Sequence, residues 1–141
     1  MTAARLAIRA ARPRRLTRTL LWAAQIPLAA GFVIVAVSKL TGNHQMVREF
    51  GLIGAGQWLR YFSGTAELAG AIGLLTPWLA GLAAAGLAAN MAGATIINAT
   101  VLHNTEFGSN VWLTAVLCAV TGLIAYGRRQ QIKGLWAAIR W

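Results

Sequence analysis

Hydrophobic positions fall into four long blocks, and short polar segments separate them. The blocks run from Leu20 to Leu40, from Trp58 to the turn at Thr76-Pro77, from about Trp78 to Leu102, and from about Asn110 to Tyr126. About 20 apolar residues in a helix cross the roughly 30 Å hydrocarbon layer of a membrane. The pattern therefore predicts an all-α membrane protein with a compact bundle of four transmembrane helices.

The two ends of the chain are polar and basic. Residues 1–19 carry six arginines and show no strong apolar face, and residues 128–141 carry four more cations. Because positive charge marks the cytoplasmic side of membrane proteins, both termini are predicted to be cytoplasmic, which requires an even number of spans. The expected organisation is a basic tail (1–19), a four-helix transmembrane domain (20–127) and a second basic segment (128–141).

Two short segments are expected to lie on the membrane surface. Residues 41–57 are polar and glycine-rich, yet Met46, Val47 and Phe50 share one helix face, which predicts an interfacial helix on the outer side. The final segment, 128–141, predicts an amphipathic helix on the inner surface, and the alternative is a disordered basic tail. Its apolar stripe consists of Ile132, Leu135, Trp136 and Ile139.

Tryptophan positions agree with four crossings. Tryptophan prefers the headgroup boundary, where its ring is buried and its N–H stays hydrated. Trp22, Trp58, Trp78 and Trp112 each fall at one end of an expected helix.

Composition narrows the class of protein further. Hydrophobic residues make up 57% of the chain and charged residues 11%, and the mean hydropathy is +0.59, which excludes an ordinary soluble domain. The net charge of +10 points to membrane topology and anionic lipid headgroups, and no nucleic-acid motif is present. Cys118 is the single cysteine, so no intrachain disulfide or paired-thiol motif can form.

Glu67 is the most unusual residue of the apolar blocks. It is one of three acidic residues and lies at the centre of the second block. A carboxylate at that depth is costly and normally faces the bundle interior with a cationic partner. Lys39 and Arg60 are the two candidate partners, and Lys39 could instead extend to the headgroups.

A polar interior around Glu67 is predicted from helix faces. Arg60 and Ser63 share its face, and Asn98 lies on a polar face of the third block together with Asn90. Lys39 and His103 stand near the outer helix ends and would cap this interior. Simple helix-to-helix hydrogen bonding is the preferred interpretation for Asn90, Thr114 and Thr121, and packing is preferred for Cys118. No residue set has metal-ligand spacing, so no metal is expected.

The order of these features resembles the DoxX-like family of small four-helix membrane proteins. The resemblance covers about Leu20 to Arg128, and the glutamate of the second helix is its most distinctive part. It implies an integral protein of the cytoplasmic membrane, and some members are membrane subunits of thiosulfate:quinone oxidoreductases or associate with redox enzymes. The matching residues are Gly31, Lys39, Leu40, Phe50, Gly51, Leu52, Gly64, Glu67, Leu68, Gly70, Leu74, Leu75, Pro77, Met91 and Ala94.

Three functions compete at this point. The first is a membrane subunit that binds quinone or a similar isoprenoid lipid beside a redox partner, with Glu67 handling protons, Lys39 as its charge partner, and Arg60, Ser63, Asn98 and His103 binding the ligand. Such a subunit could not pass electrons unaided, because the chain has no haem-ligand pair, flavin motif or cysteine pair. The second is a non-catalytic scaffold or assembly factor. The third is a small-solute transporter, which would need a homo-oligomer because no internal repeat is evident.

Overall fold

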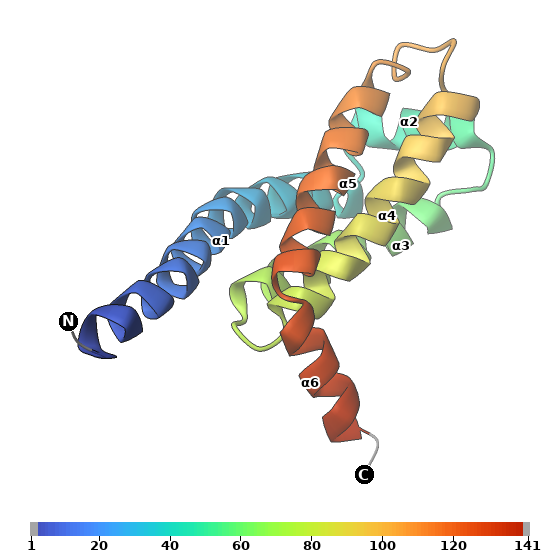
Figure 1. The fold of residues 1–141 in the computed structure, drawn as a ribbon. Helices are drawn as coiled ribbons and strands as arrows, with labels where there is room; N and C mark the ends of the chain where they lie inside the picture. The colour runs from blue at the N-terminus through green and yellow to red at the C-terminus, as the bar shows by residue number, and fades with distance from the viewer. Residues whose placement is uncertain (1–2, 140–141) are drawn as a thin grey trace.

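The computed structural model describes the backbone of residues 3–139 and the side chains of residues 15–138. Within that part the regular structure is entirely helical. The helices are α1 (Ala3–Leu40), α2 (His44–Ile53), α3 (Trp58–Leu75), α4 (Ala80–Thr100), α5 (Asn110–Gly127) and α6 (Arg129–Ile139). Figure 1 shows this order along the chain.

Helix positions follow the hydrophobic blocks closely. The long helices α3, α4 and α5 begin and end within about two residues of the predicted limits, as is usual for helix ends. The interfacial segment forms α2, and the basic C-terminal segment forms α6. One difference concerns α1, which continues without a break from the first apolar block back to Ala3, so the segment predicted as a tail is helical. Alanine and arginine are strong helix formers, which explains this extension.

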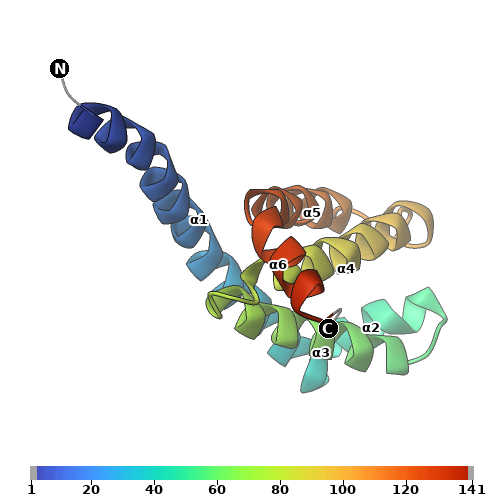
Figure 2. The same ribbon diagram turned by 60° about the horizontal axis from the view of Figure 1, so that its bottom comes forward.

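The helices pack as two pairs. The most extensive contacts join α1 with α3 and α4 with α5, and contacts between α3 and α4 connect the pairs. The N-terminal half of α1 extends away from α4 and α5 (Figure 1), and the view in Figure 2 shows the same separation.

Small residues allow the close approach of α3 to α4. A side chain at Gly70 would collide with Leu87, and one at Gly73 would collide with Ala83. Small residues at a helix interface let the two backbones approach closely in this way.

The core lies where α1, α3 and α4 meet, and large apolar side chains also cover the outside. Buried residues include Phe32 from α1, Leu74 from α3 and Leu87 from α4. Exposed apolar side chains of this number would be unfavourable in water, and they indicate contact with lipid. They include Ile34, Phe62, Ile96, Leu113 and Leu123.

Three helical segments of the described residues are long and apolar enough to cross a membrane. They are Arg15–Leu40 within α1, all of α4 and all of α5. The chain is therefore a multi-pass membrane protein. Helix α3, which the sequence predicted as a fourth span, is not among them. It carries both Arg60 and Glu67, and these charged residues lower its mean hydropathy.

A defined turn returns the chain from α1 to α2. Gly42 adopts a left-handed φ of 73°, which glycine tolerates without a steric penalty. The Asn43 side chain then accepts a hydrogen bond from the Gln45 backbone N–H and caps α2. The turn places Phe50 of α2 over the end of α1, where its ring lies 5.7 Å from the Lys39 ammonium nitrogen.

Candidate functional site

Lys39 and Glu67 form a buried ion pair between α1 and α3. The Lys39 Nζ to Glu67 Oε1 distance is 2.6 Å, and the two residues are 8% and 1% exposed. Of the two partners considered for Glu67, the structure selects Lys39. The pair satisfies the rule that a buried charge needs an opposite charge within hydrogen-bond distance.

Ser63 and Asn90 complete the polar centre around this pair. The Lys39 ammonium donates to Ser63 Oγ at 3.0 Å, and Asn90 Nδ2 lies 3.3 Å from Glu67 Oε1 and 3.5 Å from Ser63 Oγ. We call these four residues, Lys39, Ser63, Glu67 and Asn90, the Lys39–Glu67 centre. It connects α1, α3 and α4 by side-chain hydrogen bonds.

Asn90, for which sequence analysis preferred simple helix-to-helix hydrogen bonding, makes such bonds from α4 to α3 and belongs to the centre. The signal that could have identified it is depth below the α3–α4 turn. At a rise of 1.5 Å per residue, Glu67 lies about 12 Å from this turn along α3 and Asn90 about 15 Å from it along α4. Asn98 lies about 27 Å from the turn along α4, much deeper than Glu67. In antiparallel neighbours, equal depth brings side chains together.

One oxygen of the Glu67 carboxylate remains without a hydrogen bond. Oε1 receives both Lys39 and Asn90, while the buried Oε2 has no partner among the described residues. A buried carboxylate oxygen that accepts nothing is unfavourable by about 1–3 kcal/mol or more. The centre therefore holds free acceptor capacity at a defined atom.

Arg60 is buried but does not contact Glu67. Its Nη1 donates to the Lys39 backbone carbonyl, and its Nε donates to the Gln57 side chain at 2.8 Å. The guanidinium also lies over the Tyr61 ring at 4.3 Å. Arg60 thus holds the backbone of Lys39 itself at the end of α1, whereas the ion pair is formed by the Lys39 side chain.

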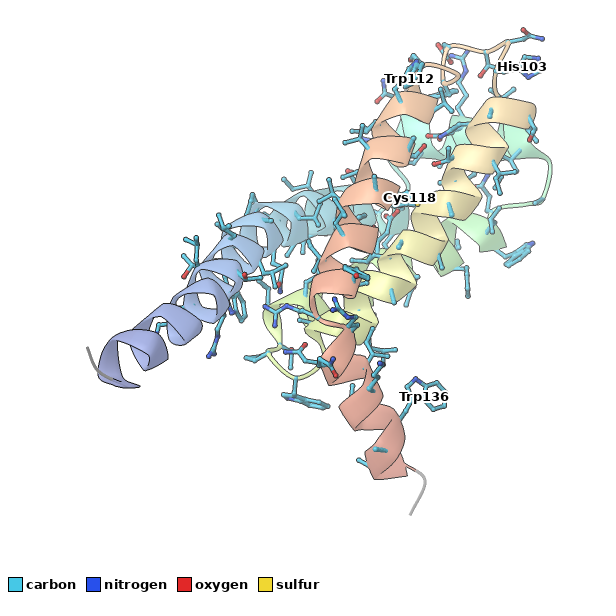
Figure 3. The ribbon with its side chains drawn as sticks, in the orientation of Figure 1. His103, Trp112, Cys118 and Trp136 are labelled. Atoms are coloured by element: carbon cyan, nitrogen blue, oxygen red, sulfur yellow. The ribbon has the colours of Figure 1, made fainter. Side chains whose placement is uncertain are left out.

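Asn98 and His103 lie apart from the centre. Asn98 is buried and donates to Thr114 Oγ1 of α5 at 3.4 Å, so it links α4 with α5. His103 is exposed in the loop after α4, with Nδ1 3.0 Å from the Thr100 carbonyl. Figure 3 shows it at the end of the molecule opposite α6. The expectation that His103 caps the polar interior does not match this geometry, because α4 ends before the residue.

Glu49 is a nearby acid that sequence analysis placed only within the interfacial segment. It is half-buried on α2, next to Phe50. Burial raises the pKa of Glu49 above 4.5; the Lys39 charge lowers it and the Glu67 charge raises it again. The polar centre therefore has a second carboxylate on its α2 side.

A second buried polar cluster lies at the C-terminal end of α3. Gln25 of α1 is fully buried; its Nε2 donates to the Leu74 carbonyl and its Oε1 accepts from Arg128 Nε, both at 2.6 Å. Arg128 joins α5 to α6, is 7% exposed and lies 5.4 Å from the Trp22 ring. We call Trp22, Gln25 and Arg128 the Arg128 cluster. Sequence analysis counted Arg128 among the residues of a basic tail.

Cys118 packs between α5 and α4. Cys118 is half-buried on α5 and its Sγ lies 3.5 Å from the Ala88 carbonyl, in agreement with the packing role predicted for it. Figure 3 shows it between α5 and α4. The described side chains contain no group of three or more His, Cys, Asp or Glu residues that could hold a metal ion.

The Lys39–Glu67 centre combines a cation, a carboxylate, a hydroxyl and an amide in an apolar bundle. Such a set can donate hydrogen bonds to a carbonyl oxygen and can accept a proton at a carboxylate oxygen. Its charges balance, so a neutral ligand fits it better than an ion.

Comparison with known proteins identifies the family. A sequence model described as the DoxX-like family matches residues 23–123 of the 141-residue chain. Comparisons with curated proteins and with solved structures find no match. The matched region contains the whole Lys39–Glu67 centre and confirms the resemblance seen in the sequence. The chain belongs to the DoxX-like family.

Proposed function

We propose that this protein is a membrane subunit that binds the headgroup of a quinone or a similar carbonyl-bearing isoprenoid lipid at the Lys39–Glu67 centre and works with a redox partner protein. One observation carries the proposal: the buried Glu67 Oε2 has no hydrogen-bond partner among the described residues, whereas Oε1 of the same carboxylate accepts from Lys39 and Asn90. A quinone changes its proton count on reduction, so its site needs both hydrogen-bond donors and a proton acceptor.

Each residue of the centre has a role in this proposal. Lys39 and Asn90 are donors to a ligand carbonyl, and Ser63 positions both through its hydroxyl. Glu67 Oε2 accepts the proton of a ligand hydroxyl, while Lys39 keeps the carboxylate charged between turnovers. The redox partner supplies and removes electrons.

The proposed setting is the cytoplasmic membrane, with four crossings and both termini inside. Supporting this, cations are concentrated in the two terminal segments, and α3 packs along α1 despite its polar residues. A reporter fused after Trp141, compared with one fused before Met1, tests the orientation. The proposal requires both reporters in the cytoplasm; opposite locations would mean an odd number of crossings.

A second function is favoured by a different observation. The centre ties α1, α3 and α4 together with direct hydrogen bonds, as expected of a scaffold whose ion pair sets helix register. In that case the protein assists the assembly of a partner and retains no ligand.

The first experiment is mass spectrometry of organic extracts from gently purified protein. We compare wild type with Glu67→Gln, and with Glu106→Gln as the matched control, because Glu106 is an exposed acid paired with Arg48 on the surface. The proposal predicts a stoichiometric isoprenoid ligand in wild type and Glu106→Gln that is lost in Glu67→Gln.

A double variant separates the two functions. Replacing both members of a buried pair by apolar residues of similar size often preserves stability. Lys39→Met with Glu67→Leu should therefore keep the fold. Quinone binding predicts that this folded protein has lost its ligand, whereas the scaffold function predicts normal partner assembly and bulk phospholipid only in every extract.

A further inference from the structure

We propose that the Arg128 cluster is a binding site for a phosphate group, and that the headgroup of an anionic phospholipid is its natural source. This site is separate from the Lys39–Glu67 centre, and the proposal does not rest on the quinone function. Arg128 is a buried arginine whose positive charge no acidic side chain balances.

Arg128 has no acidic partner among the described residues. The protein has three acidic side chains, and two of them are paired elsewhere, Glu67 with Lys39 and Glu106 with Arg48. The third, Glu49, interacts with Lys39 and Glu67. A buried cation without a counter-charge is strongly unfavourable unless an anion from outside the chain compensates it.

The guanidinium also has free donors. Arginine carries five N–H groups, and among the described residues only Nε–H of Arg128 finds an acceptor, at Gln25 Oε1. Its Nη2 is buried without any partner there. The planar fork of arginine matches two phosphate oxygens, so the unused edge has the geometry that phosphate recognition requires.

The surroundings hold Arg128 in place and add positive charge. Gln25 fixes Nε, the Trp22 ring lies at 5.4 Å, and the Arg128 backbone and Cβ pack against Gly81 of α4. Burial lowers the pKa of Arg128, and the charge of Arg18 lowers it further, so Arg18 lies close enough for repulsion. An anion between two neighbouring arginines relieves both effects.

The location favours a lipid as the source of the phosphate. Arg18 and Trp22 lie one turn apart near the start of the first apolar segment. Trp78 is exposed and lines a surface hollow together with Leu135 of α6, and the neighbouring Trp136, labelled in Figure 3, is exposed as well. Tryptophan and basic residues together mark the headgroup layer, and basic sites between helix ends bind anionic headgroups.

The test measures thermal stabilisation of the full chain in neutral detergent micelles during titration with dioleoyl phosphatidylglycerol. Dioleoyl phosphatidylcholine and inorganic phosphate are titrated in parallel. Phosphatidylglycerol should stabilise the wild type most, and Arg128→Gln should weaken its apparent affinity by about tenfold or more, because charge-assisted bonds to phosphate are lost. Arg129→Gln is the matched control: Arg129 is exposed, and its guanidinium binds the Tyr126 carbonyl.

Arg18→Gln keeps the experiment decisive if Arg128→Gln does not fold. Arg18 is exposed, so its loss should weaken phosphatidylglycerol binding with little effect on the stability of the apo protein. Stabilisation by inorganic phosphate equal to that by the lipid would assign the site to soluble phosphate. Equal phosphatidylglycerol affinity in wild type, Arg18→Gln and any folded Arg128→Gln would overturn the proposal.

Discussion

The two buried polar clusters contact α3 at different places, one near its middle and one at its C-terminal end, and they accommodate buried charge in different ways. The Lys39–Glu67 centre balances its charges within the chain, through an ion pair at 2.6 Å. The Arg128 cluster buries a cation whose contacts are a neutral amide and an aromatic ring. A closed pair can set helix register alone, whereas an unbalanced cation implies an anion supplied from outside.

The largest expected effect comes from removing one charge of the balanced centre. Lys39→Met leaves Glu67 buried without its cation and should lower the free energy of unfolding by about 3–5 kcal/mol. Unfolding by SDS in micelles measures this loss. The double variant with Glu67→Leu should recover most of it, and a double variant as unstable as Lys39→Met would mean that the pair is not the source of the effect.

The second prediction concerns Gln25, the uncharged side chain that accepts the hydrogen bond from Arg128. Gln25→Leu keeps side-chain volume but leaves the Leu74 carbonyl and Arg128 Nε without partners, which should cost about 1–3 kcal/mol. The same unfolding assay in micelles without anionic lipid measures it. A loss as large as that of Lys39→Met would remove the energetic distinction between the clusters.

The third prediction compares two asparagines of α4, Asn90 within the Lys39–Glu67 centre and Asn98 outside it. Asn90→Ala and Asn98→Ala should each reduce stability by about 0.6 kcal/mol, the usual size of a hydrogen bond between membrane helices. Only Asn90→Ala should also reduce ligand retention, because Asn98 binds Thr114 away from the centre. Equal ligand loss in both variants would point to a general loosening of α4.

The smallest effect is a pH dependence from Glu49. Its pKa is higher in the folded protein than in the unfolded chain, so ionised Glu49 opposes folding at neutral pH. As the pH falls through the raised folded pKa, wild type should gain thermal stability relative to Glu49→Gln. Melting curves of the two proteins from neutral to mildly acidic pH measure the difference, and a constant difference would contradict the burial of Glu49 beside the centre.

Sequence analysis correctly predicted the family and the positions of α2 to α6, though not the extension of α1 to Ala3, and it identified Glu67 with Lys39 as a candidate partner. These features depend on local patterns: apolar runs of membrane-spanning length, basic flanks, and an acid in an apolar block. It expected His103 to cap the polar interior and did not place Asn90 beside Glu67, because helical periodicity gives the face of a residue but gives neither its depth nor its neighbour across the bundle.

The sequence by itself determined that this chain is a helical membrane protein with one improbable carboxylate, because composition and periodicity reflect the bilayer directly. Only the tertiary structure decided which side chains meet. Pairing of α3 with α1 selected Lys39 over Arg60 for Glu67, and the approach of residue 128 to residue 25, far apart in the chain, turned an apparent tail arginine into a buried cation. Such contacts depend on helix packing, which local sequence does not encode.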